Sequence, residues 1–185
     1  MTTKQYVALL RGINVGGKNK VLMPDLRAVF EELGYVAVRT YIQSGNVLFE
    51  SDSPSSSLES DIETILERRF RVPLVVVVRS HSQLRKVVGD APAGFGKTPD
   101  TYHSDTIFLR APLTAKQAMR IVELREDVDQ AWPGRGVIYF SRVSALRTKS
   151  RMSRIVGTPE YKLMTIRSWS TTTKLLDLLD DHRDQ

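Results

Sequence analysis

Cysteine is absent from this sequence, and histidine occurs only three times. The lack of cysteine excludes disulfides, thiolate catalysis and cysteine-ligated zinc or iron–sulfur sites. The histidines, His81, His103 and His182, are widely separated along the chain. We therefore expect no metal site and no bound cofactor, and a Ser-His-Asp triad has no local support.

Long apolar runs are also lacking. No stretch approaches the roughly 20 residues that cross a bilayer, and the start, Met-Thr-Thr-Lys-Gln, lacks the parts of a signal peptide. The 185 residues are 41% hydrophobic and 26% charged, which is typical of a soluble folded chain with one domain or two small ones. We expect a cytoplasmic protein without a membrane partner.

Basic residues are unevenly distributed along the chain, whose formal net charge is +6. Residues 135–174 carry nine basic side chains and one acid, Glu160. Such a region could attract a polyanion, or it could be a solvated surface with structural ion pairs. Both interpretations stay open.

The first half of the chain alternates strand and helix patterns. An apolar run at residues 5–10 predicts a strand, and apolar residues at 26, 29, 30 and 33 predict a helix that begins near Pro24. Two strands follow around the turn at 44–46, then a helix over 58–70 and a run at 74–78 that is typical of a strand buried on both faces. This β-α-β-β-α-β order predicts a ferredoxin-like unit.

The second half repeats much of this order. The pattern predicts a strand at 106–110, a helix over 114–125, strands at 128–132 and 137–140, and helices near 150–156 and 168–179. A closing strand is not evident, which leaves open an incomplete second copy. We predict the α+β class, with two ferredoxin-like α/β sandwich halves, residues 1–88 and 105–185. Residues 89–104 join them as a linker, and the second half carries the C-terminal helices.

Two segments resemble a phosphate-binding P-loop. Gly12, Gly17 and Lys18 have its spacing, but Asn19 stands where the magnesium-binding hydroxyl belongs, and the helix signal begins only at Pro24. Residues 91–98 match the looser form, but no strand precedes them and Pro99 disfavours a helix there. Neither segment has the strand–turn–helix context, so we do not expect a P-loop NTPase.

The segment Arg11–Lys20 is nevertheless a long, glycine-rich and cationic connection between a strand and a helix. Connections of this length in compact domains are often functional, and consecutive backbone amides beside cations can bind an anion. The alternative is a mobile loop whose glycines serve geometry alone. The sequence does not separate these two readings.

Three stretches of the chain resemble a known family. The sequence RGINVGG at 11–17, MPDL at 23–26 and YIQSGNV at 41–47 are similar to the opening signature of the bacterial domain of unknown function 1697 family. The ending YKLMTIRSWSTTTKLLDLL is similar to the family's closing motif, except that Ser168 and Ser170 replace expected asparagines. The resemblance implies two ferredoxin-like halves and implies no reaction.

The predicted strand order brings two polar segments together. In a ferredoxin-like sheet the first and third strands are neighbours, so the turn before the third strand should approach the loop after the first. We therefore expect one polar patch that binds a small anion such as phosphate, a nucleotide or a carboxylate. Bracing of the loop by its own Asn and Ser side chains is an equally good reading. The candidate ligand-binding residues are Arg11, Gly12, Asn14, Gly16, Gly17, Lys18, Gln43, Ser44 and Asn46.

The alternative function is RNA binding by the basic region and by aromatic residues of the second sheet, because RNA-recognition domains stack bases on such sheets. The match to their signatures is poor, and burial of these aromatics is the simpler reading. For catalysis only Asp25 and His81 are candidates, and only because they titrate. The oligomeric state is open. A second basic site would comprise Arg147, Lys149, Arg151, Arg167, Trp169 and Lys174.

Overall fold

The computed structural model describes residues 3–181 and divides into two compact units. The first unit comprises Met1–Leu84 together with Leu175–Gln185, and the second comprises Arg85–Lys174. This division differs from the expected one, because the end of the chain from Leu175 joins the first unit. His182 lies outside the described residues. Within the described part of the chain, no helix is long and apolar enough to span a membrane.

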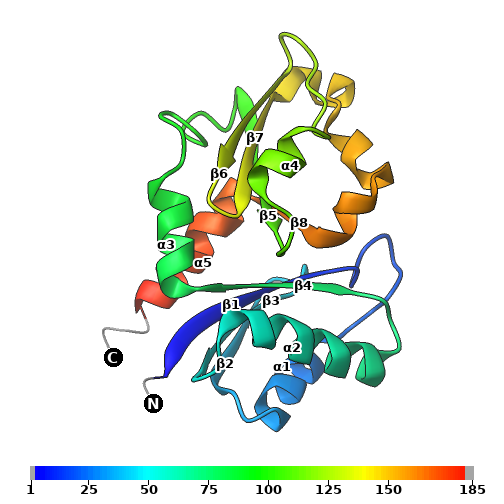
Figure 1. Ribbon diagram of the computed structural model, residues 1–185, viewed down its shortest axis with the longest axis vertical. Helices are drawn as coiled ribbons and strands as arrows, with labels where there is room; N and C mark the ends of the chain where they lie inside the picture. Colours follow the sequence, from blue (N-terminus) through cyan, green and yellow to red (C-terminus); the bar gives the residue numbers. More distant parts are fainter. Residues whose placement is uncertain (1–2, 182–185) are drawn as a thin grey trace. The chain divides into compact units, whose positions relative to one another are not determined.

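The first unit is a four-stranded antiparallel sheet with two helices on one face (Figure 1). The strand order is β2-β3-β1-β4, so β1 and β3 are central neighbours. Both helices expected in this half are confirmed. The elements are β1 (Lys4–Arg11), α1 (Met23–Glu32), β2 (Val36–Tyr41), β3 (Asn46–Ser51), α2 (Ser55–Phe70) and β4 (Val75–Ser80).

Apolar spacing explains how these helices pack. Leu26, Val29 and Phe30 are the buried side of α1, whose first turn contains Pro24. On α2 the buried apolar residues recur every four positions, at 58, 62 and 66. These side chains form one core with the inward residues of the strands, where Phe30 meets Phe49 edge to face at 5.3 Å.

The outer edge of β4 is closed by three glutamates of α2. The backbone N–H of Val78 donates to Glu59 at 2.9 Å. Val76 donates to Glu63 at 3.0 Å, and Leu74 donates to Glu67 at 3.4 Å. Four residues of a helix span about 6 Å along its axis, and two residues of a strand span about 7 Å. Glutamates four residues apart on α2 therefore face backbone N–H groups two residues apart on the strand. The helix thus satisfies the donors that an edge strand leaves unpaired.

The second unit contains a second four-stranded antiparallel sheet of order β6-β7-β5-β8. In both sheets the spatial order is second, third, first and fourth strand of the unit. α3 (His81–Gly89) begins in the first unit and ends in the second. The remaining elements are β5 (Tyr102–Leu109), α4 (Ala115–Met119), β6 (Asp129–Gly134), β7 (Val137–Val143), the 3-10 segments η1 (Ser144–Lys149), η2 (Met152–Gly157) and η3 (Pro159–Leu163), β8 (Met164–Ser168) and α5 (Trp169–Asp181).

Four expectations for the second unit need correction. The closing strand that was not evident in the sequence is present, because β8 pairs with β5. The helix expected over 114–125 is α-helical only at Ala115–Met119, and the one expected near 150–156 is a 3-10 segment. The expected linker 89–104 ends earlier, since β5 begins at Tyr102. The chain is therefore mixed α/β with two four-stranded antiparallel sheets.

Candidate functional site

The loop between β1 and α1 is a small hairpin. Asn14 N–H donates to the Asn19 carbonyl at 3.0 Å, and Lys18 N–H donates to the Val15 carbonyl at 3.0 Å. Gly16 and Gly17 occupy the tip with φ of 57° and 75°, as a type I′ turn requires. Because α1 begins only at Met23, Lys18 does not stand at a helix N-terminus. The geometry of a P-loop is not present here.

The second P-loop lookalike has no such geometry either. Residues 91–98 form successive turns, in which Phe95 N–H donates to the Pro92 carbonyl and Lys97 N–H to the Gly94 carbonyl. The next regular element after Thr98 is the strand β5. A helix whose first turn contains the lysine and threonine is required to cradle phosphates, and this segment lacks it.

Asn14 joins the hairpin to the turn between β2 and β3. Its Nδ2 donates to the Gln43 carbonyl at 2.9 Å and to the Val21 carbonyl at 2.9 Å. Its Oδ1 accepts the Val21 N–H at 2.8 Å. Leu10 N–H also donates to the Gly45 carbonyl at 2.8 Å. The structure therefore brings the two polar segments together, as the strand order requires.

Asn46 serves to shape the turn. It is fully buried, and its Nδ2 donates to the Tyr41 carbonyl at 3.0 Å and to Ser44 Oγ at 3.1 Å. Gly45 has φ of 86°, and a Cβ there would lie 2.8 Å from Ile13 Cδ1. Asn14 and Asn46 thus brace the backbone, while Gln43 and Ser44 are exposed beside the hairpin.

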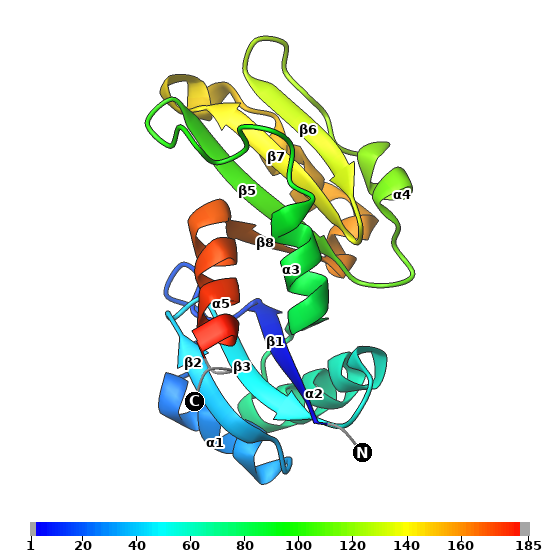
Figure 2. The same cartoon turned by 90° about the vertical axis from the view of Figure 1, so that its left-hand side faces the viewer.

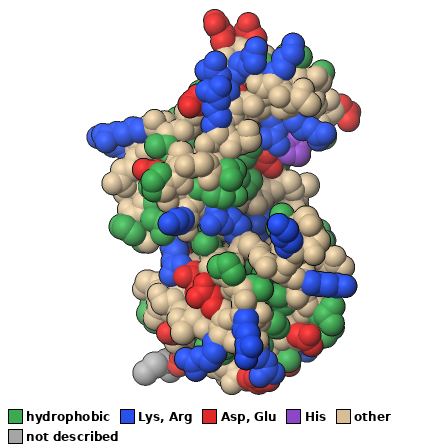
Figure 3. Space-filling model, turned by 90° about the vertical axis from the view of Figure 1, so that its right-hand side faces the viewer, with side chains coloured by type: hydrophobic (Ala, Val, Ile, Leu, Met, Phe, Trp, Pro, Cys, Tyr) green, Lys and Arg blue, Asp and Glu red, His purple; other side chains and the backbone are tan. Residues whose placement is uncertain are grey.

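We call residues 11–22 together with residues 42–46 the loop surface. Its cations are Arg11, which is half-buried, and Lys18 and Lys20, which are exposed. No acidic residue occurs between Arg11 and Asp25, and within residues 3–181 neither lysine forms an ion pair. The loop, dark blue at the right of Figure 1, faces the viewer in Figure 3, where lysine and arginine side chains lie among hydrophobic ones. The loop surface is cationic and also presents apolar side chains, namely Val15, Leu22 and Ile42.

The second basic region does not form one stripe. Arg167 on β8 is only 7% exposed, and burial lowers its pKa to about 10. The backbone N–H of Arg151 donates to Asp129 Oδ2 at 2.9 Å, and its guanidinium reaches the Leu124 carbonyl. Trp169 packs against Gly96. The remaining three residues, Arg147 and Lys149 on η1 and Lys174 on α5, are exposed.

Three aromatic residues at the centre of the second sheet, on β5 and β7, are buried, whereas Trp132 on β6 is half-buried and Tyr102 at the start of β5 is exposed. Phe108 and Phe140 are fully buried, and Tyr139 is 1% exposed. The Tyr139 ring is covered by Phe95 at a centroid distance of 5.4 Å and by Trp169 at 6.4 Å. Base stacking requires an open ring face, and these three residues do not offer one.

Titratable side chains form two further sites. Asp25 is exposed in the first turn of α1, whereas His81 is buried and its Nε2 lies 2.6 Å from Asp180 Oδ1. In the second unit Asp105 contacts Arg142 at 3.1 Å and His103 at 3.3 Å. Burial raises the pKa of the Asp105 carboxyl, and the charges of His103 and Arg142 oppose this shift.

The Asp105 cluster was not found by sequence reasoning. Its residues lie on β5 and β7, and only the pairing of these strands brings them together. Within residues 3–181, no group of three or more potential metal ligands is assembled. The contacts of the cluster are ion pairs, which join Asp105 to His103 and to Arg142.

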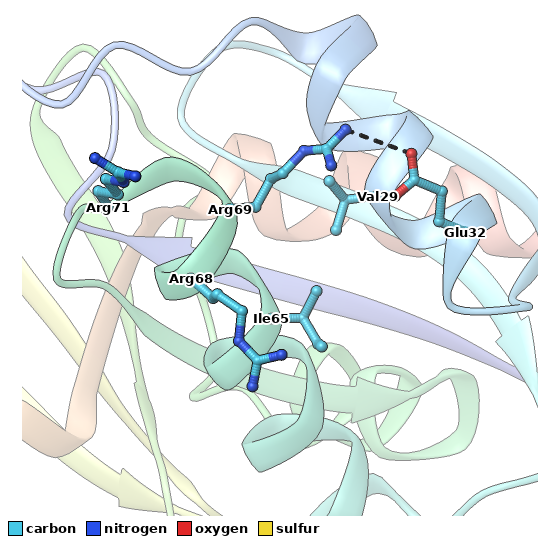
Figure 4. Close-up of a pocket in the computed structure, with 6 residues that line it drawn as sticks. All are labelled: Val29, Glu32, Ile65, Arg68, Arg69 and Arg71. Atoms are coloured by element: carbon cyan, nitrogen blue, oxygen red, sulfur yellow. Dashed lines mark ion pairs between the residues drawn. The ribbon is translucent and has the colours of Figure 1, made fainter.

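A hollow of about 350 Å³ lies between α1 and α2 (Figure 4). Three arginines line it, and Arg69 pairs with Glu32 at 3.5 Å. In Figure 4 the side chains of Arg68, Arg69 and Arg71 point in different directions. They do not converge on one point, as a cradle for an anion would require.

Comparison with known proteins places this chain in a family. It is similar to the conserved bacterial protein SP0830 from Streptococcus pneumoniae, with 27% identity, a TM-score of 0.82, and coverage of 96% of this chain and 99% of that one. An unknown protein from Galdieria sulphuraria covers 90% of this chain and 98% of its own at 14% identity, but its TM-score of 0.27 is too low to indicate a shared fold. No curated protein matches. Because residues 3–139 match the family described as "Protein of unknown function (DUF1697)", the chain belongs to the DUF1697 family.

Proposed function

We propose that the protein binds a small anionic ligand, such as phosphate, a nucleotide or a carboxylate, at the loop surface. The observation that carries this proposal is the bridge made by Asn14, which holds the hairpin against the turn at 2.9 Å. Because this bridge fixes the backbone, the cations and the exposed polar groups share one ordered surface. A ligand that binds here loses little to ordering the loop.

The hairpin tip supports close approach of an anion. A Cβ added at Gly16 or Gly17 would meet no atom within 4 Å, so the space beside the tip is open. The N–H groups of these two glycines take no part in the hairpin bonds and can donate to a ligand. Each exposed cation contributes only about 1 kcal/mol at contact distance in water, so affinity requires Lys18, Lys20 and the amides together.

A ferredoxin-like arrangement of each half is part of this proposal. Both sheets have the first and third strands of the unit in the centre, with the second and fourth at the edges. In such a sheet the loop after the first strand and the turn before the third emerge at one rim. The proposed site therefore belongs to the fold of the first unit and needs no part of the second.

The test is a thermal unfolding series at low ionic strength with inorganic phosphate, ATP and succinate. A ligand at a hundredfold excess over its Kd stabilises by about 2.7 kcal/mol, which raises Tm by about 5 °C or more. The double variant Lys18→Gln/Lys20→Gln should lose the shift. Lys116→Gln/Lys162→Gln removes the same charge from two exposed lysines elsewhere and should keep it. No shift with any of the three anions, or an equal shift in the loop variant, would overturn the proposal.

A further inference from the structure

A row of short polar side chains crosses one face of the second sheet. Gln130 on β6 pairs with Ser141 on β7, and Ser141 pairs with Ser104 on β5. The two neighbouring rows on this face carry bulky side chains. One row contains Trp132, which pairs with Tyr139, and the other contains Tyr102. Neighbouring rows on one face of a sheet are about 7 Å apart. The short row therefore leaves a trough, which has a volume of about 210 Å³.

The loop after α3 forms one wall of this trough. Figure 2 shows the loop passing in front of β5 and β7. Its Phe95 is 7% exposed and meets Trp132 and Trp169 edge to face at 6.1 and 5.0 Å. Gly96 has φ of 71°, and a Cβ there would overlap the Trp169 indole. The wall is fixed by aromatic packing, so the trough is formed before any ligand arrives.

The floor of the trough has unused hydrogen-bonding capacity. Ser104 and Ser141 are 7% and 6% exposed, and their hydroxyls lie 3.4 Å apart. Two hydroxyls offer two donors and four acceptor sites, of which a bond between them uses one of each. No lysine, arginine, aspartate or glutamate lines the trough. Aromatic walls over an uncharged polar floor suit a neutral flat ring with polar edges.

A second hollow adjoins the trough. It has a volume of about 340 Å³ and shares Gly96, Tyr102 and Ser104 with the first. Its other lining residues include three with hydroxyl side chains, Ser168, Ser170 and Thr173, beside Pro99, His103 and Trp169. A ligand that fills both hollows needs a flat ring at one end and a hydroxylated group at the other.

We propose that the second unit binds a neutral nucleoside, with its base in the trough and its ribose in the adjoining hollow. The base lies between the aromatic walls, and its polar edge meets Ser104, Ser141 and the amide of Gln130. The ribose hydroxyls meet the hydroxyls of the second hollow. This site is independent of the anion site proposed for the first unit.

Tryptophan fluorescence tests the proposal directly, because the only two tryptophans, Trp132 and Trp169, each line one of the two hollows. Uridine and adenosine, titrated into the full chain, should quench the emission and reach saturation at millimolar concentration or below. Ribose alone should bind at least about tenfold more weakly, because it makes no base contact. Equal binding of ribose would make this a sugar site and overturn the proposal.

Variants then locate the binding. Ser104→Ala/Ser141→Ala removes the floor hydroxyls and should weaken nucleoside binding by about tenfold. Gln130→Ala changes an exposed residue of the edge strand and should weaken binding without endangering the fold. Ser153→Ala, an exposed serine on η2, should leave binding unchanged. Lys18→Gln/Lys20→Gln should also keep full nucleoside binding, whatever its effect on anions. No quenching by either nucleoside, or an unchanged Kd in both pocket variants, would overturn the proposal.

Discussion

In the first unit a 16-residue helix, α2, connects β3 to β4, whereas in the second unit three short 3-10 segments connect β7 to β8. The strand order is the same in both sheets. In the first unit the helix covers one sheet face and also closes the edge strand through its glutamates. In the second unit the loop after α3 covers part of a sheet face and leaves a trough beside it. The face of the second sheet that packs against α4 and η2 has its own core, and the trough lies on the opposite face, because Ser104 and Ser141 alternate with the core residues of β5 and β7. One strand order thus carries a long helix in one half, and short segments with a hollow on the opposite sheet face in the other.

The largest effect should come from changing the loop that covers the second sheet. In Gly96→Ala the new Cβ overlaps the Trp169 indole, and the alanine backbone must adopt φ of 71°. Overpacking and a left-handed backbone together cost about 4 kcal/mol. Urea unfolding should show this loss of stability. If the loop were a loose cover, the indole would move aside and the loss would stay near that of a left-handed backbone alone.

Gly94 supplies the matched control for this change. It lies two residues earlier in the same loop with φ of 81°, and a Cβ there would meet no atom within 4 Å. Gly94→Ala should therefore cost about 1 kcal/mol, from the backbone alone. Equal losses in the two variants would contradict the claim that the loop is fixed by packing against Trp169.

The next largest effect should come from the helix that closes the first sheet. Glu59 is buried, accepts from Val78 N–H at 2.9 Å and lies 3.6 Å from the Arg79 guanidinium. Glu59→Ala leaves a buried N–H and a half-buried cation without this partner, which costs about 3 kcal/mol. Urea unfolding with a constant m-value measures the loss.

The third glutamate of the ladder is the control for the first. Glu67 is exposed, and its bond to Leu74 N–H is long at 3.4 Å. Glu67→Ala should cost no more than about 0.5 kcal/mol, because water replaces the carboxylate. If both variants lost the same stability, helix propensity rather than edge closure would explain the effect.

The first unit was predictable from sequence because its helices bury regular apolar stripes, such as Leu26, Val29 and Phe30. β8 was missed because two of the three side chains that it buries, Thr165 and Arg167, are polar, and only Met164 is apolar. The helix expected over 114–125 is short because residues 123–127 are all exposed, so a longer helix would have had no face to bury. Apolar periodicity reports burial only where apolar side chains are the ones buried.

The two candidate sites, the loop surface and the trough, also differ in how far the sequence predicts them. Contact between the loop and the turn of the first unit follows from the order of strands, which the pattern of elements already indicates. The trough depends on the register that aligns Gln130, Ser141 and Ser104 across three strands. The pairing of Gln130 with Ser141 is local to the hairpin of β6 and β7, but the register of β5 against β7, which aligns Ser104 with Ser141 over 37 residues of chain, does not follow from local patterns. The path of the loop with Phe95 does not follow from them either.

The smallest expected effect comes from removing the hydroxyl of one buried tyrosine in each sheet. Tyr139 is 1% exposed and its hydroxyl donates to the Val87 carbonyl at 2.6 Å; Tyr6 is 2% exposed and donates to the Ser53 carbonyl at 2.7 Å. Tyr139→Phe and Tyr6→Phe each remove one hydrogen bond and should each cost about 1 kcal/mol at neutral pH. Similar losses would mean that both sheets are tied equally to the segments that cover them.

Alkaline pH sharpens this comparison. Burial raises the pKa of Tyr139 from 10.0 to about 12, and the charge of Asp90 adds to the shift. A raised pKa means that the folded state holds the proton more tightly than the unfolded state. The stability from this proton is complete below pH 10 and is lost as the pH rises through about 12. Tyr139→Phe lacks this loss, so its deficit relative to the parent protein should shrink between pH 10 and 12. A deficit that stays constant over this range would mean that the Tyr139 hydroxyl is reached by water, and that the loop does not seal this part of the sheet.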